Sequence, residues 1–220
     1  TKLKASAATA DQAMKQAMAA LRPGMTEEEV AAIVRASFVH SGAMPVFAII
    51  GAGANGAFPH HHTGPSVIRD GDAVVMDIGG RLEGYFSDMT RMAVIGTMPP
   101  DYMKVHDVVE QAVCAALAAA RPGVAARVVD EAARNVITRA GYGEYFVHRT
   151  GHGLGRTVHE DPYITGTSDT ILREGMVFSI EPGIYLPGRF GIRLEEIVFL
   201  RADGPEILSV LPRAPFHVTA

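Results

Sequence analysis

An internal repeat with a period near 100 residues constrains this chain more than any other feature of its sequence. Arg22-Pro23-Gly24 ends one segment with helical periodicity, and Arg121-Pro122-Gly123 ends another one 99 residues later. A helix-closing glycine recurs at the same offset, as Gly42 and Gly141. A repeat this long exceeds the unit of a solenoid. It therefore predicts two homologous α+β halves that share one central sheet.

Both halves show the same order of elements: helix, helix, a loop with histidines, and then antiparallel strands. In the first half, helical periodicity covers 3–21 and resumes at Thr26, whose spacing from Glu29 predicts a capping box. The predicted strands of this half are 46–50, 73–77 and 85–95, and a predicted loop covers 51–66. We expect an α+β fold with the helices on the outer face of a curved antiparallel sheet.

Composition favours a single domain without nucleic acid or membrane partners. No linker-like segment interrupts 1–220, so we expect one domain with repeats of roughly 1–98 and 99–220. The 20 Lys and Arg residues against 24 Asp and Glu give a net charge of −4, which disfavours nucleic-acid binding. The longest purely apolar run, 112–120, is too short to span a bilayer. The single Cys114, expected in the core, excludes an internal disulfide and favours a cytoplasmic location.

Acidic residues lie at matched points of the repeat. Asp77 follows Gly71 by six residues, and Glu181 follows Gly175 by the same spacing. Two more acids, Asp88 and Glu195, lie in the next strand runs. Carboxylates at the ends of apolar strands are costly unless a cation or metal pairs with them. Because the sequence offers only two nearby arginines, we expect a pair of divalent ions to balance the charge.

Histidines near these acids supply nitrogen ligands. His152 lies in a Gly-His-Gly segment, where the glycines allow close approach of backbone and ligand. Four carboxylates and one imidazole suit Mn, Co, Fe or Zn in a two-metal site. Such a site lowers the pKa of a shared water towards about 7 and activates it for attack on a carbonyl. The loop His60-His61-His62 is flanked by Pro59 and Gly64, which indicates a second site loop.

Five motifs, in order, resemble the pita-bread metallopeptidases: the methionine aminopeptidases, prolidases and Xaa-Pro aminopeptidases. The motifs are Asp77-Ile-Gly, Asp88-Met-Thr-Arg, Gly-His152-Gly-Leu-Gly, Glu181-Pro-Gly-Ile-Tyr and Gly-Ile-Arg-Leu-Glu195, and they cover essentially the whole chain. The resemblance implies the pita-bread fold and five ligands to two ions, with Asp88 and Glu195 bridging them. It also implies that Glu181 shuttles protons while a metal-bridging hydroxide attacks the peptide.

The resemblance assigns further roles to four residues around the ligands. His60, 17 residues before Asp77, is similar to the substrate-contacting histidine of the proline-specific members. His148 and His159 match the pair that holds the substrate carbonyl and the tetrahedral intermediate. Arg193 matches an arginine that hydrogen-bonds to nearby ligands. The neighbours of His60 in the loop are expected to be bystanders.

The loop around His60 is similar to the Xaa-Pro branch, since methionine aminopeptidases carry Cys-His-Gly at this point. The expected substrate is a dipeptide or short peptide with proline at the second position, and the expected metals are Mn or Co, with Zn or Fe as alternatives. Proline-specific members also have an N-terminal capping domain that helps form a homodimer. That domain is absent from this chain, so we expect a fragment of a longer, dimeric protein.

Other functions on the same fold remain open. The chain could act like a methionine aminopeptidase, or it could hydrolyse a non-peptide amide. A metal-free hydrolase similar to creatinase and a non-catalytic peptide-binding module are further alternatives. The five intact ligand positions argue against these last two.

Overall fold

Four long helices and twelve strands form the part of the chain that the computed structural model describes, residues 1–219. The helices are α1 (Lys2–Ala20), α2 (Glu27–His40), α3 (Tyr102–Ala119) and α4 (Ala126–Arg139). Two short 3-10 helices, η1 and η2, cover Gly53–Ala57 and Gly143–Tyr145. None of the helices within residues 1–219 is long and apolar enough to cross a membrane.

The first half places α1 and α2 against one sheet. Its strands are β1 (Met44–Ala52), β2 (Ala73–Leu82), β3 (Tyr85–Phe86) and β4 (Met89–Ile95). They pair antiparallel in the order β1-β2-β4, with β3 on β2. The predicted capping box starts α2: the Thr26 hydroxyl accepts from the Glu29 amide, and the Glu29 carboxylate accepts from the Thr26 amide.

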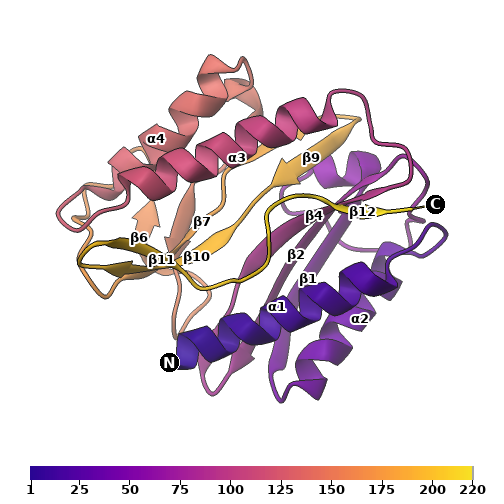
Figure 1. Cartoon of the computed structure of the whole chain (residues 1–220), viewed down its shortest axis with the longest axis horizontal. Helices are drawn as coiled ribbons and strands as arrows, with labels where there is room; N and C mark the ends of the chain where they lie inside the picture. Colours follow the sequence, from indigo (N-terminus) through magenta and orange to yellow (C-terminus); the bar gives the residue numbers. More distant parts are fainter. Residues whose placement is uncertain (220) are drawn as a thin grey trace.

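The second half repeats the arrangement with α3 and α4. Its strands are β5 (Gly151–Gly153), β6 (Glu160–Ile164), β7 (Val177–Ile180), β8 (Gly183–Leu186), β9 (Phe190–Arg193), β10 (Glu196–Arg201), β11 (Gly204–Ile207) and β12 (Phe216–Val218). One sheet has the order β11-β10-β7-β5-β6, and β8 and β9 form a separate hairpin. Figure 1 shows α1 and α2 on one side of the molecule, α3 and α4 on the other, and the strands between them.

Matched backbone hydrogen bonds make the two halves pseudo-symmetric. The Gly24 amide donates to the Ile68 carbonyl at 2.9 Å, and the Gly123 amide donates to the Leu172 carbonyl at 2.8 Å. Both glycines have φ near +90°, a conformation that other residues rarely adopt. The predicted α+β fold with two related halves and outer helices is thereby confirmed.

The strands differ from the prediction in four details. Their ladders form three sheets instead of one shared sheet, and β12 runs parallel to β4. The predicted run 85–95 is broken between β3 and β4, because the Ser87 amide and hydroxyl both bond to Gly80. Asp88 lies in this break. The predicted loop 51–66 is shorter, since β1 extends to Ala52 and η1 follows it.

Cys114 was expected in the core, and this prediction is wrong. The residue lies on the exposed face of α3, where its thiol contacts Glu110 and Arg213. The buried face of α3 is formed instead by residues such as Val109 and Val113.

Successive side chains of β2 point to opposite faces of the strand, and this alternation determines the direction of Asp77. Met76 and Ile78 belong to the apolar core under α1 and α2, whereas Ala73 and Val75 belong to the core under α3 and α4. Asp77 has the same parity as Ala73 and Val75, so its side chain points between the two halves.

Candidate metal centre and active site

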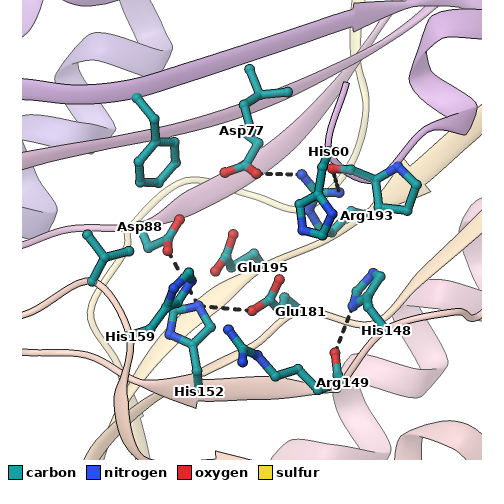
Figure 2. A pocket seen from close by; sticks show the side chains of 14 residues that line it. His60, Asp77, Asp88, His148, Arg149, His152, His159, Glu181, Arg193 and Glu195 are labelled. Atoms are coloured by element: carbon teal, nitrogen blue, oxygen red, sulfur yellow. Dashed lines mark hydrogen bonds and ion pairs between the residues drawn. The ribbon is translucent and has the colours of Figure 1, made fainter. Parts of the chain in front are cut away.

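All nine residues predicted for the site line one cavity of about 470 Å³ between the two halves. These are His60, Asp77, Asp88, His148, His152, His159, Glu181, Arg193 and Glu195. Figure 2 shows the acidic side chains and His152 converging on a common space, with His60, His148 and His159 around it. The repeat therefore brings together side chains from positions more than 100 residues apart.

Two of the five predicted ligands lie inside strands, and the other three lie directly beside strands. Asp77 lies within β2, Asp88 directly precedes β4, and His152 is the central residue of β5. Glu181 directly follows β7, and Glu195 lies between β9 and β10. These positions give each side chain a fixed backbone beneath it, as a binding site needs.

Glycines on both sides of His152 allow β5 to lie unusually close to its neighbours. A Cβ on Gly151 would come within 1.9 Å of the Ser179 carbonyl oxygen, and one on Gly153 within 2.3 Å of the Asp161 carbonyl oxygen. The Ser179 hydroxyl accepts from the His152 amide at 3.0 Å and donates to Glu181 Oε1 at 2.9 Å. Ser179 thus fixes the histidine relative to the glutamate.

The donor set fits divalent metal ions. Asp88, His152 and Glu195 are buried, and each offers a ligand atom within 4.8 Å of the other two. Among the described residues, Glu195 Oε1 and Asp77 Oδ1 are buried oxygens without a hydrogen-bond partner. Buried carboxylate oxygens rarely lack a partner unless an ion binds them. Asp77 and Glu195 both line the cavity, so a cation bound there would satisfy these oxygens.

His152 is oriented as a metal-binding imidazole. Its Nδ1–H donates to the Gly153 carbonyl at 3.1 Å, which leaves Nε2 facing the acids. Nε2 lies 3.1 Å from Glu181 Oε1 and 3.6 Å from Asp88 Oδ2. A backbone carbonyl on the other ring nitrogen is a common support for histidine ligands.

The carboxyl groups of the cavity have strongly perturbed pKa values. Burial raises the pKa of Asp88 and of Glu195 well above the usual range, and neighbouring acids raise both further. Burial also raises the pKa of Asp77, in spite of Arg193. Burial acts in the same direction on Glu181, but the hydrogen bond and charge of His152 outweigh it and lower that pKa to about 2. Such clustering of perturbed groups marks a functional site.

A chain of hydrogen bonds runs from Asp77 to His148. Arg193 donates to Asp77 Oδ2 at 2.5 Å and to the Tyr185 hydroxyl oxygen at 2.7 Å. Because arginine only donates, the Tyr185 O–H is free to donate to His148 Nε2 at 2.7 Å. His148 Nδ1–H then donates to the Arg149 carbonyl at 2.7 Å. Burial lowers the pKa of His148 to about 4, so this ring is neutral at physiological pH.

His159 lies at the exposed rim of the cavity. Its ring stands edge-on to His152, with a centroid distance of 4.3 Å. Burial and the neighbouring His152 lower its pKa. His159 is therefore mostly uncharged near neutral pH and open to a ligand.

Several lining residues were missed by the sequence analysis. Phe47 and Ile49 of β1 form an apolar wall, and Arg149 adds a cation beside the ligands. Tyr185 belongs to the motif that begins at Glu181, but its role in linking Arg193 to His148 follows only from its hydrogen bonds. His61, expected to be a bystander, lies outside the cavity and pairs with buried Glu27.

The family of the chain follows from comparison with known proteins. The sequence profile described as Metallopeptidase family M24 matches residues 1–202. The chain belongs to this family. The M24 chain is 49% identical over 194 residues to the probable dipeptidase PepE of Mycobacterium tuberculosis, covering 87% of this chain and 52% of the relative. It is 41% identical over 206 residues to the Xaa-Pro dipeptidase of Lactobacillus helveticus, covering 92% and 56%.

Solved structures share the fold of the M24 chain. The X-Pro aminopeptidase of Thermotoga maritima superimposes with a TM-score of 0.96 at 41% identity, covering 99% of this chain and 62% of that one. The prolidase of Pyrococcus furiosus gives 0.94 at 38% identity, covering 96% and 64%. The chain spans about half the length of the curated relatives it matches. The resemblance to pita-bread metallopeptidases of the proline-specific branch is confirmed.

Proposed function

We propose that this chain carries the catalytic centre of a metallopeptidase that hydrolyses the bond between an N-terminal residue and a following proline. The observation that carries the proposal is the convergence of four carboxylates and one imidazole on a single cavity, two of them with orphaned oxygens. The names of the similar proteins, Xaa-Pro dipeptidase and prolidase, support the proline specificity.

Two divalent ions, Mn or Co, would be held by the five predicted ligands. These are Asp77, Asp88, His152, Glu181 and Glu195, with Asp88 and Glu195 shared between the ions. When bound, the ions would supply an activated water and a polarised scissile carbonyl. Arg193 forms an ion pair with Asp77, and the negative charge of the other acids supports the binding of cations at this site.

Glu181 is the residue we assign to proton transfer. Its carboxylate lies in the cavity beside His152, where it would accept a proton from the attacking water. Cleavage converts the proline nitrogen into a secondary amine, which needs one proton. Glu181 returns that proton to the nitrogen, and the hydroxyl part of the water stays on the new carboxyl carbon, so the atoms balance.

Histidines on the rim would hold the substrate. His159 and His60 present imidazoles to the cavity, and N–H donors there stabilise the oxygen that becomes negative during attack. The hydrogen bond from the Tyr185 hydroxyl fixes the ring of His148 at one side of the cavity. Proline has no amide hydrogen, so the site needs no acceptor at that point.

The test compares Xaa-Pro with Xaa-Ala peptides of equal length, with Mn or Co saturating. We expect cleavage of Xaa-Pro and little of Xaa-Ala, and we expect an acetylated N-terminus to block the reaction. Equal or better cleavage of Xaa-Ala would refute the proline specificity and leave a general metalloaminopeptidase. Failure to cleave any peptide, in a chain that holds both ions, would favour a non-peptide amide as substrate.

A further inference from the structure

A buried carboxylate outside the cavity accepts hydrogen bonds from the loop that carries His60. Glu27, at the first turn of α2, is 0% exposed. Its Oε1 accepts from the Ala52 amide and from Asn55 Nδ2, both at 2.9 Å. Its Oε2 accepts from His61 Nε2 at 2.8 Å and from the Gly64 amide at 3.4 Å. One carboxylate therefore holds both ends of the same loop.

The segment between these two attachments faces the active-site cavity. Pro59 and His60 line the cavity, and the Pro59 carbonyl accepts from Arg193 at 3.4 Å. His60 itself is exposed, and Figure 2 shows its ring directed into the site. The loop is thus fixed by Glu27 on its outer side and by Arg193 on its inner side, with the histidine between them.

The other half of the molecule forms the matching helix start without a carboxylate at this position. At the matching position, 99 residues later, the residue is Ala126. Its amide donates to the Thr170 carbonyl at 2.9 Å, as the Glu27 amide donates to the Ser66 carbonyl at 3.0 Å. The start of this helix therefore forms without a carboxylate at this position.

The second half has its own buried carboxylate one turn further along α4, Asp130, which accepts from the Thr150 amide and from Arg134. Because burying a charge is costly, each carboxylate depends on its donors. The donors of Glu27 come from the two ends of the loop that carries His60.

We propose that Glu27 and His61 are positioning residues that set the place of His60 in the active site. The carboxylate only accepts, so His61 Nε2–H must donate, which orients the residue next to His60. His60 then keeps its direction into the cavity although its own side chain is exposed. The proposal rests on the proposed peptidase function for its kinetic test and on the loop geometry for its structural one.

The kinetic test is a double-mutant cycle between His61 and His60. His61→Ala should lower kcat/KM on Xaa-Pro peptides about tenfold or more, because small displacements of a catalytic group are costly. The matched control is His62→Ala, the exposed neighbour, which should stay within about twofold of the parent. In a His60→Ala background, His61→Ala should cause no further loss. Independent, multiplicative losses would overturn the proposal.

The structural test does not need activity. In metal-loaded protein, Glu27→Gln should speed hydrogen exchange at the Ala52 or the Gly64 amide more than at amides of the second half, because the NH₂ group that replaces one carboxylate oxygen cannot accept from that amide, while bound metal stays near that of the parent. Glu28→Gln, at the residue next to Glu27 on the same helical turn, alters an exposed ion pair with Arg35; this control should leave exchange unchanged. Unchanged exchange in Glu27→Gln would overturn the proposal even if the protein had no peptidase activity. Faster exchange without activity would refute only the proposed function.

Discussion

Removing one ligand charge should stabilise the metal-free protein. The substitution is Glu195→Gln, at a side chain that is 2% exposed. Its Oε2 accepts from the Thr90 hydroxyl at 2.8 Å, a bond that glutamine can keep, whereas Oε1 has no partner. The change therefore removes charge with little loss of contacts.

The size of the effect follows from the distances between the ligand atoms. A ligand oxygen of Glu195 lies within 4.8 Å of one of Asp88. At that distance two carboxylates repel by about 3 kcal/mol for an effective dielectric constant near 20. Uptake of a proton relieves part of this repulsion, so we expect a gain of about 1–3 kcal/mol. For a chain of this length each kcal/mol moves Tm by about 2–4 °C, which gives a rise of about 2–12 °C.

The assay is calorimetry of chelated protein across pH 5–8. The folded pKa of Glu195 is raised above its unfolded value by burial and by Asp88. The folded parent therefore binds more protons than the unfolded chain and loses stability as pH rises through this range. The advantage of Glu195→Gln should grow towards pH 8 and shrink towards pH 5.

Saturating Mn should reverse the order of stability. The parent should gain about 2.7 kcal/mol at a metal concentration of 100 Kd, and Glu195→Gln should gain much less. Asp203→Asn, at an exposed acid, is the control and should leave Tm unchanged in both conditions. A lower Tm for chelated Glu195→Gln at pH 8 would show that the reasoning about repulsion is wrong.

Three further substitutions separate catalysis from stability. His159→Ala should keep metal and Tm near the parental values but lower kcat by about 10²-fold or more, as measured on Xaa-Pro peptides. Tyr185→Phe should break the link from Arg193 to the neighbouring histidine and lower kcat about tenfold, with bound metal unchanged by elemental analysis. Arg91→Met should lower the free energy of unfolding by about 3–5 kcal/mol in urea, because Arg91 is 0% exposed and donates to Glu196 at 2.9 Å.

The acids of the cavity were predicted partly from local patterns and partly from the resemblance to a known family. Asp77 and Glu181 occupy matched points of the repeat, at the same spacing from Gly71 and Gly175. The helices were equally readable, since the Thr26 capping box and the Gly42 stop are local signals. The strand break at Asp88 was not predicted, because it depends on bonds between Ser87 and Gly80 across a turn.

Long-range pairs explain what the sequence did not show. Glu27 and His61 are 34 residues apart, and no local sequence pattern in either segment predicts their contact. The parallel pairing of β12 with β4 joins the end of the chain to its first half, where the short run 216–218 carries no strong strand pattern. Cys114 is exposed because the opposite face of α3 packs on the sheets, a choice that helical periodicity leaves open.

Counting bound ions tests the central claim most directly. After loading with Mn or Co and removal of free metal, elemental analysis of the parent chain should give two equivalents per chain. Asp88→Asn, at a ligand assigned to both ions, should reduce the binding of both. A folded parent chain that holds no ions with all five side chains intact would contradict the account.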